Sequence, residues 1–322
     1  MIKKILRFFK ITLTVLLALI FLGWLAFVPS ASGPGYELVS TWGTSGSGPS
    51  EFNDPTGIAI TDDEVFVSDA RNNRIQVFNW DGVFKRQITK TGKNGEKLGR
   101  PMNLTIKNGL LYVPDYWNDQ IDIFSTAGDW KKSIGSAGNE PGQMRSPGGL
   151  AVMDNGDLLI AGFYNQRIQK LNAGGTFIRQ WGKTKKIGIG AEQFNYPTDV
   201  TIAPDGSIVI ADGYNDRVQV FDKNGNFVRK WGGPFGVNIF GPFNGWFATV
   251  TDVDVDSNGL IYVADFYNDR IQVFDKNGTF INNFGKGTLD KAIGVAASRD
   301  GKTVFAVDYR GNRISKWQRN SE

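Results

Sequence analysis

The chain has 322 residues and contains neither cysteine nor histidine, which excludes disulfide bonds, thiolate metal sites and imidazole as a general base or metal ligand. Its formal net charge is +4, but four of its 36 basic residues (Lys3, Lys4, Arg7 and Lys10) lie in the first ten positions, which leaves 32 basic against 32 acidic residues. The rest of the chain is therefore neutral and lacks the basic field of a nucleic-acid binder, so we expect no nucleic-acid partner.

The chain begins with an apolar leader. Residues 11–28 (ITLTVLLALIFLGWLAFV) carry no charge over 18 positions, which is the lower end of the length of a membrane-spanning helix. We predict a basic cytoplasmic segment over 1–10, a transmembrane or signal segment over 11–28 and a linker over 29–35. The basic flank predicts a single-pass protein of the cell membrane with its main domain on the extracytoplasmic side. Small residues follow in PSASG, so cleavage of the leader, which would give a secreted protein, stays open.

Residues 36–322 are built from a repeat. IADGYNDRVQVFDKNGNF (210–227) returns almost unchanged as VADFYNDRIQVFDKNGTF (263–280), and four weaker copies complete a set of six. The anchor positions of the copies lie 46, 47, 50, 53 and 43 residues apart, at Asp69, Asp115, Gly162, Asp212, Asp265 and Asp308. A period of this size, made of short strands separated by Asp/Asn/Gly turns, indicates the blade of a β-propeller.

The ends of the chain predict how the ring of blades closes. Five copies are followed by an outer strand, but the sixth ends at RISKWQRNSE without one. A matching strand, YELVSTWG (36–43), stands before the first copy instead. If this strand completes the last blade, no sheet edge is left open to aggregation. We therefore predict an all-β, six-bladed propeller closed by an N-terminal strand, with 313–317 as the partner of 36–43.

The D-x-x-N-x-R-I-Q-V-F core of the repeat, with F-x-x-P-x-G/D-V/I ahead of it, resembles the NHL repeat. The resemblance covers about residues 36–322 and is strong in blades 1, 4 and 5, counted in chain order. It implies a β-propeller, in agreement with the strand count. NHL-like lyases that act on peptidylglycine-type substrates use a metal site that relies on histidines, and this chain has none.

The anchor position is an aspartate in five of the six copies, and the position five residues later is an arginine in five of the six. The arginine is lost in blade 2 (Gln120) and the aspartate in blade 3 (Gly162). An unpaired half-buried charge is costly, so we predict that each arginine reaches the aspartate of the next blade, because both losses then fall in one pair. Arg217 should accordingly bind Asp265 rather than Asp212.

The turns between the second and third strands of the blades open on one face of a propeller, around the mouth of its channel. They carry aromatic and arginine side chains, which dominate binding hot spots. The candidate ligand-binding residues are Arg71, Tyr116, Trp117, Tyr164, Tyr214, Tyr267, Tyr309 and Arg310, with Phe163 and Phe266 beside them. The alternative is that these rings only pack against neighbouring blades.

The longest connection, residues 232–252, is also aromatic-rich, with Phe235, Phe240, Phe243, Trp246 and Phe247. A loop of this length is more often functional than its shorter neighbours. A simple apolar cover over the junction of blades 4 and 5 is the second interpretation, and the sequence does not separate the two.

Three polar residues stand at equivalent positions of the inner strands. Asn103, Asp199 and Asp252 could converge on the channel and hold a hard cation such as Ca²⁺ through oxygen ligands. Six-bladed enzymes of the lactonase and gluconolactonase kind use such a cluster, a likeness at the level of the fold. Because Asp and Gly both suit the turn that enters a strand, a structural role is the alternative.

The sequence offers no pair of nucleophile and base and no phosphate-binding glycine motif. We therefore expect no catalytic residues and no cofactor, with Ca²⁺ as the one candidate. The predicted function is a monomeric, membrane-anchored scaffold that binds a protein, peptide or glycan through its aromatic-lined face. The alternative is a cation-dependent hydrolase or lactonase of the six-bladed propeller kind.

Overall fold

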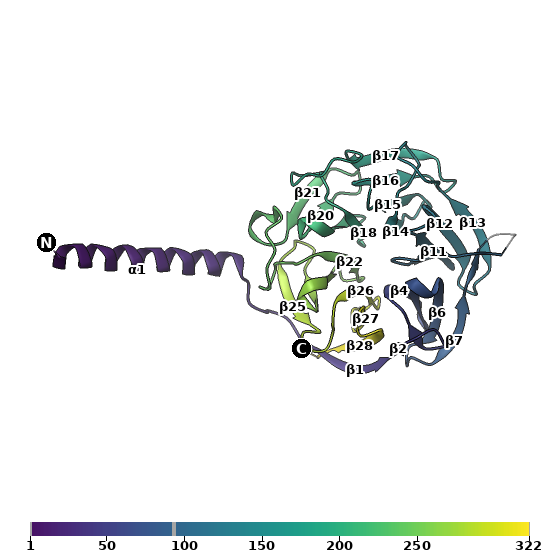
Figure 1. Ribbon diagram of the computed structural model, residues 1–322, viewed down its shortest axis with the longest axis horizontal. Coiled ribbons are helices and arrows are strands. Elements are labelled where there is room, and N and C mark those ends of the chain that lie inside the picture. The colour runs from purple at the N-terminus through teal and green to yellow at the C-terminus, as the bar shows by residue number, and fades with distance from the viewer. Residues whose placement is uncertain (1, 92–94, 322) are drawn as a thin grey trace.

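The structure is a computed structural model that describes residues 2–91 and 95–321. Figure 1 looks onto a ring of β-sheets, with the innermost strands around the centre and the helix α1 (Ile2–Phe27) projecting to one side. The ring confirms the predicted all-β propeller of six blades.

Five blades are antiparallel four-stranded sheets of consecutive strands, so each is a meander that runs outward from the channel. Their strands, from the inside to the outside, are β4 (Pro55–Ile60), β5 (Glu64–Asp69), β6 (Arg74–Asn79) and β7 (Phe84–Ile88) in blade 1; β10 (Thr105–Lys107), β11 (Leu110–Asp115), β12 (Gln120–Ser125) and β13 (Trp130–Ile134) in blade 2; β14 (Pro147–Val152), β15 (Leu158–Gly162), β16 (Arg167–Leu171) and β17 (Phe177–Gly182) in blade 3; β18 (Pro197–Ile202), β19 (Ile208–Asp212), β20 (Arg217–Phe221) and β21 (Phe227–Trp231) in blade 4; and β22 (Val250–Val255), β23 (Ile261–Asp265), β24 (Arg270–Phe274) and β25 (Phe280–Phe284) in blade 5.

The sixth blade is completed by the N-terminal strand, as predicted. It consists of β26 (Ala292–Ala297), β27 (Thr303–Asp308), β28 (Arg313–Arg319) and, on the outside, β1 (Tyr36–Trp42). β1 pairs antiparallel with β28, and Trp42 lies opposite Ile314. The start and the end of the propeller are thus held together by backbone hydrogen bonds, and the ring has no open sheet edge at this junction.

Short elements decorate the ring. β2 (Thr44–Ser45) pairs with β3 (Glu51–Phe52), and β8 (Lys90–Thr91) pairs with β9 (Glu96–Lys97). Single 3₁₀ turns follow the second strands of three blades, namely η1 (Ala70–Asn72), η2 (Gly213–Asn215) and η4 (Phe266–Asn268), while η3 (Pro234–Gly236) lies in the long connection before blade 5.

The apolar core lies between the blades. The side chains of each strand alternate between the two faces of its sheet, so every blade presents one apolar face to each neighbour. Val209 and Val218 of blade 4, for example, pack against Val253, Val263 and Phe274 of blade 5. An equivalent cluster lies at the junction where the ring closes, between blades 6 and 1. Each blade is therefore stabilised mainly by its neighbours, as in other repeat proteins.

The N-terminal helix differs from the prediction for the leader. α1 already begins at Ile2, so Lys3, Lys4 and Arg7 belong to the helix rather than to a separate flank. In the part of the chain that the structure describes, no helix is both long and apolar enough to cross a membrane. The structure thus supports an N-terminal helix but not the transmembrane span predicted over 11–28.

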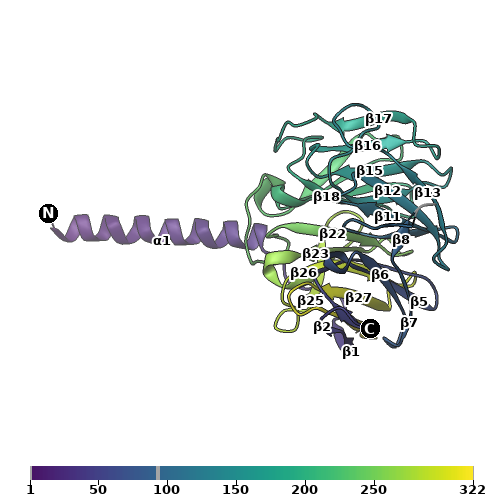
Figure 2. The ribbon, with the colours of Figure 1, turned by 45° about the vertical axis from the view of Figure 1, so that its right-hand side comes forward.

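The linker after α1 is bonded to blade 5. The indole Nε1 of Trp246 donates to the carbonyl of Phe27, and the Asn244 amide donates to the carbonyl of Pro29 at 3.0 Å. Further along, the backbone amide of Ser32 donates to the Ile281 carbonyl at 2.9 Å. The base of the helix therefore has a fixed position beside blade 5 (Figure 2).

The predicted pairing of arginine and aspartate across blades is wrong. Arg217 Nε donates to Oδ2 of Asp212 in its own blade, at 2.8 Å. The two residues face each other at the end of the β19–β20 hairpin, so the register of the hairpin brings them together. The same bond within one blade joins Arg74 to Asp69, Arg270 to Asp265, and Arg313 to Asp308.

The two residues left without their partner keep other hydrogen bonds, although the buried Nε of Arg167, the atom that would bind the aspartate, has no partner among the described residues. Asp115 of blade 2 accepts hydrogen bonds from the backbone amides of Gly99 and Arg100 and from Asn118. Arg167 of blade 3 donates to several backbone carbonyls, including that of Gln143 at 2.9 Å. The premise that a lost partner leaves a bare charge was therefore too simple.

A different set of residues links neighbouring blades. The residue just before each arginine position has a left-handed backbone conformation, which suits Asp and Asn. Oδ1 of Asp216, for example, accepts a hydrogen bond at 2.6 Å from the backbone amide of Thr249, at the entrance to the inner strand of blade 5. We call these contacts the cross-blade bonds; the other acceptors are Asp119, Gln166, Asp269 and Asn312. These bonds fix the position of each turn relative to the inner strand of the next blade.

Candidate functional site

The mouth of the channel is an aromatic-lined cavity of about 340 Å³. Every blade contributes to it. The turns after the second strands of blades 2 to 6 supply the aromatic wall: Tyr116, Phe163, Tyr214, Phe266, Tyr267 and Tyr309. Because the repeat places an aromatic residue at this point of the turn in successive blades, the side chains form a ring around the mouth.

The rings of the wall contact one another from blade to blade. The centroids of Phe163 and Tyr196 are 4.8 Å apart, and those of Tyr196 and Tyr214 are 5.0 Å apart. On the other side of the mouth, Phe266 lies 5.8 Å from Tyr309. Such tilted and edge-to-face contacts hold the rings in place while leaving flat faces available to a ligand.

Two cations brace the rim. The guanidinium of Arg100 lies 5.9 Å from the ring of Trp117 and 6.0 Å from that of Tyr116. The ammonium of Lys291 lies 5.6 Å from the ring of Tyr267 and forms a salt bridge of 2.9 Å with Asp269. These cation–π contacts orient exposed rings that would otherwise be free to rotate.

Burial keeps the phenols of Tyr116, Tyr214 and Tyr309 uncharged at neutral pH. Burial raises the pKa of Tyr116 well above its ordinary value, and a hydrogen bond with Tyr164 adds to this rise. Burial also raises the pKa of Tyr214 and of Tyr309. The wall therefore offers neutral hydroxyl groups as donors and acceptors beside apolar ring faces.

The structure brings most of the predicted binding residues together. Tyr116, Tyr214, Tyr267 and Tyr309 line the mouth itself. Among the predicted aromatic binding residues, Trp117 and Tyr267 are the most exposed, with exposed fractions of 58% and 60%.

The remaining predicted residues lie around the mouth. Tyr164 contacts Tyr116, with 6.2 Å between the ring centroids. Arg71 is bound to Asp54 by a salt bridge at the blade 1 side, and Arg310 is exposed in the turn that also carries Tyr309.

Several residues of the site escaped the sequence analysis. Arg100, Tyr196 and Lys291 occupy one repeated position at the entrance to the inner strands, where other blades have Asp54, Ser146 and Thr249. In blade 2 this position precedes Pro101, which forms an isolated bridge with Asp115 ahead of the strand. Tyr196 and Lys291 have left-handed backbones, which is unusual for bulky residues and typical of constrained sites. An alignment of the blades would have shown that this position differs from blade to blade while the neighbouring positions repeat, which is a signal of residues at a binding site.

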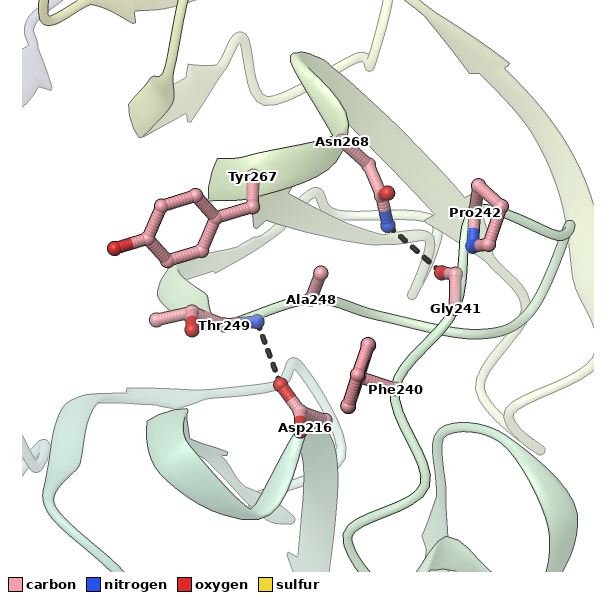
Figure 3. A pocket seen from close by; sticks show the side chains of 8 residues that line it. All are labelled: Asp216, Phe240, Gly241, Pro242, Ala248, Thr249, Tyr267 and Asn268. Atoms are coloured by element: carbon pink, nitrogen blue, oxygen red, sulfur yellow. Dashed lines mark hydrogen bonds between the residues drawn. The ribbon is translucent and has the colours of Figure 1, made fainter.

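A second cavity of about 440 Å³ opens beside the mouth (Figure 3). It lies at the junction of blades 4 and 5 and shares Thr249 and Tyr267 with the mouth. Its outer wall is the long connection, represented by Phe240, Gly241 and Pro242. Figure 3 shows the cross-blade bond from Thr249 to Asp216 at its floor.

The three predicted metal ligands meet below the mouth, inside the channel. The amide of Asn103 donates across the channel to the carbonyl of Thr251 at 3.1 Å. Asp199 accepts from the backbone amide of Val253 at 3.2 Å, and Asp252 from that of Val295 at 2.8 Å. Each carboxyl group thus binds the inner strand of the following blade. The three side chains form a hydrogen-bonded plug, the name used for them below.

The two carboxyl groups of the plug share a proton. Burial raises the pKa of Asp199 to about 6, and a hydrogen bond with Asp252 partly offsets this rise. Burial and the adjacent Asp199 raise the pKa of Asp252 well above its ordinary value. Two buried carboxylates in contact cannot both be ionised, so one of them stays protonated.

Glycines make room for the plug. The inner strands have glycine at the equivalent position of blades 1, 3 and 6. A Cβ atom on Gly149 would lie 1.8 Å from Oδ1 of Asp199. Glycine at position 149 is therefore a packing requirement, because it leaves space for the carboxyl group of Asp199.

As arranged, the plug is a poor fit for Ca²⁺. Its carboxyl oxygens already accept backbone amides, and the raised pKa of Asp252 disfavours the doubly ionised pair that would attract a cation. Ca²⁺ takes six to eight oxygen ligands, so it would have to displace these bonds. In the described residues no group of three or more acidic side chains is placed to hold a metal ion.

Comparisons with known proteins agree with this architecture. A model of the NHL repeat matches residues 52–78, 194–221 and 247–274. No curated protein matches the chain.

Among solved structures, a Bacteroides thetaiotaomicron protein of unknown function is 14% identical, with a TM-score of 0.67 over 88% of this chain and 75% of its own. A catalytically inactive virginiamycin B lyase from Staphylococcus aureus, solved with quinupristin, is 15% identical, with a TM-score of 0.60 over 88% of this chain and 99% of its own. A streptogramin B lyase is 15% identical, with a TM-score of 0.58 over 89% and 88% of the two chains.

At these identities the likeness shows the fold alone. The three matches of the repeat model fall in blades 1, 4 and 5, which are the blades where the resemblance is strong in the sequence. The chain is a six-bladed β-propeller that carries NHL repeats.

Proposed function

We propose that the propeller is a binding scaffold that recognises a protein, peptide or glycan through its aromatic-lined mouth. The observation that supports this most is the convergence of aromatic side chains from five blades on one cavity of about 340 Å³. Exposed, braced rings with neutral hydroxyl groups bind sugar faces and apolar or planar side chains through surface complementarity. No covalent step is involved.

A cation-dependent hydrolase or lactonase is the second candidate. The convergence of Asn103, Asp199 and Asp252 favours it, although their oxygens are engaged with backbone amides. Calcium titration followed by thermal melting separates the two functions. A rise of several degrees at micromolar calcium would support the enzyme, because a ligand that binds only the folded state raises its stability.

We also propose that the chain is held at the cell membrane through residues 11–28, with a monomeric propeller on the extracytoplasmic side. The exposed apolar side chains of α1, which include Leu13, Leu16 and Leu19, support this attachment. Fractionation of cells with an alkaline wash tests it. The chain should stay with the membranes, and its release into the wash would contradict the attachment.

Binding can be tested with the full chain in detergent on arrays of oligosaccharides and of extended peptides. We expect reproducible binding to one class, and a loss of at least about tenfold in a Tyr116→Ala/Tyr267→Ala double variant, since hot-spot aromatics carry most binding energy. Ile178→Ala/Val228→Ala, which changes exposed residues of outer strands, is the matched control. Binding to neither array, or full binding by the double variant, would contradict the assignment of the mouth.

A further inference from the structure

The long connection between β21 and β22 is an uncharged, exposed apolar loop. Residues 232–251 contain no Asp, Glu, Lys or Arg. Two of its phenylalanines project into solvent, Phe235 with an exposed fraction of 75% and Phe240 with 72%, and Ile239 and Phe243 are exposed beside them. Clustered apolar side chains of this kind mark a surface that contacts a partner or a membrane. We call this segment the entry loop of blade 5.

The entry loop is attached to the base of α1. Trp246 donates its indole hydrogen to the carbonyl of Phe27, one of the last carbonyls of the helix, which have no partner within the helix. The rings of Phe27 and Phe235 meet edge to face, with 5.3 Å between their centroids. The apolar surface of the helix therefore continues into the loop, and Figures 1 and 2 both place the helix base on this side of the ring.

The kind of partner follows from α1. Its exposed apolar residues include three consecutive positions twice, 15–17 and 19–21, so they surround the helix rather than form one stripe. A protein groove covers one face of a helix, whereas lipid covers every face. No acidic residue precedes Glu37, and the basic residues gather at the start of the helix, which complements anionic lipid headgroups.

The structure assigns to the entry loop the role of a second lipid contact: Phe235, Ile239, Phe240 and Phe243 insert at the membrane surface beside the base of α1. Aromatic and apolar side chains without nearby charges are suited to this shallow depth. The contact rests on the proposed lipid attachment of residues 11–28 but does not require α1 to cross the bilayer. It orients the propeller so that the second cavity, which Phe240 borders, opens beside the lipid.

The absence of native cysteine allows a direct test with single labels on the full chain. Three variants, Phe235→Cys, Leu17→Cys and Ile187→Cys, carry an environment-sensitive nitrobenzoxadiazole label. Ile187 is the matched control, because it has an exposed fraction of 57% and lies in the equivalent connection before blade 4. The labelled chains are incorporated into phosphatidylcholine–phosphatidylglycerol vesicles with and without lipids that carry a nitroxide quencher near the headgroup.

We expect the label at 235 to be quenched about twofold and the label at 187 to be unchanged, because only the entry loop reaches the interface. Quenching at 17 without quenching at 235 would overturn the loop contact while leaving the lipid attachment of α1 intact. Quenching at none of the three sites would overturn both. Equal quenching at 235 and 187 would show that the whole face approaches lipid, and would overturn the assignment to this loop.

Affinity for the same vesicles provides a second measurement. Phe235→Ser/Phe240→Ser should weaken binding of the full chain about tenfold, because two apolar side chains no longer leave water on binding. Ile187→Ser/Ile189→Ser, which changes exposed residues of the other connection, should bind as the unaltered chain does. Equal affinities of the two double variants would contradict the proposal.

Discussion

Two sets of repeated side chains distinguish the interior of the ring from its mouth. Inside, the aspartate–arginine pairs and the plug are polar but buried, and nearly every oxygen and nitrogen has a protein partner. At the mouth, Trp117 and Tyr267 repeat with similar regularity but are exposed. Repetition alone therefore does not indicate function. What separates the two sets is whether the hydrogen-bonding groups and ring faces are already occupied within the protein.

The largest expected effect comes from the interior. Arg217→Met removes the partner of Asp212, and both side chains are fully buried. Breaking a buried ion pair by removing one partner costs about 3 to 5 kcal/mol, and here the carbonyls of Gly190 and Gln193 also lose their donor. We therefore expect the free energy of unfolding to fall by that amount in denaturant titrations. Lys223→Met, an exposed substitution of the same blade, should change it by less than about 0.5 kcal/mol. A small loss for Arg217→Met would show that the interior set is dispensable.

A smaller loss is expected where the plug meets glycine. Gly149→Ala places a Cβ atom against Asp199, so the carboxyl group must shift away from Val253. Overpacking of this kind costs about 1 to 3 kcal/mol. The control Gly174→Ala lies in an exposed turn with a looser contact of 3.2 Å to Asn172. Thermal melting of both variants checks the difference. Equal melting temperatures would mean that the channel accommodates the added methyl group without displacing Asp199.

Blade 2 contains an interior residue that breaks the repeat. Asp122 stands where four other blades have glutamine, and burial raises its pKa to about 6. The folded state thus binds a proton more tightly than the unfolded chain, so this group makes the protein less stable as the pH rises from about 4 to about 6. Above pH 6 the carboxylate is buried and ionised.

Asp122→Gln removes this pH dependence. The amide should donate to Asp115, as Gln219 does to Asp212 at 3.0 Å in blade 4. We expect a gain of about 1 to 2 kcal/mol at pH 7.5, which is less than the full shift because the substitution disturbs the hydrogen bonds from Gln120 and Ser133 to the carboxylate, and a much smaller gain at pH 4.5. Unfolding titrations at the two pH values check this. A gain that is independent of pH would mean that Asp122 does not titrate in this range.

Substitutions at the mouth should have little effect on stability, in contrast to those in the interior. Trp117→Ala/Tyr267→Ala removes exposed rings, so we expect a change in the free energy of unfolding of less than about 0.5 kcal/mol. Calorimetric melting of the double variant measures it. A marked loss of stability would show that these rings serve packing between blades, which would erase the contrast with the interior.

The sequence predicts the propeller well because the closure of the ring changes the strand pattern at both ends of the repeat array. The missing outer strand after RISKWQ and the spare strand before the first blade could be matched from their patterns alone, and β1 pairs with β28 as expected. The partner of Arg217 was predicted wrongly, because the penalty for an unpaired charge was weighed without the backbone groups that can replace a partner. The same backbone groups also bind the intact pairs, as the carbonyl of Gln193 accepts from Arg217, but they become visible only in the folded structure.

For the candidate site as well, some features follow from the repeat and others do not. The shared location of Tyr116, Tyr214 and Tyr309 follows from their equal place in each blade. The meeting of Asn103, Asp199 and Asp252 in the channel also follows from register. Their bonds to the strands of the next blade depend on side-chain rotamers and on the spacing between blades, and a single sequence does not specify these distances.

The pairing of β1 with β28 has a consequence for biosynthesis. The first strand of the propeller leaves the ribosome long before its partner, so the outer edge of the sixth sheet stays uncovered until β28 has been synthesised. Such distant contacts slow folding, and an uncovered edge invites association with other chains during the wait. Loss of β28 from the nascent chain would leave both β1 and β27 without a strand partner.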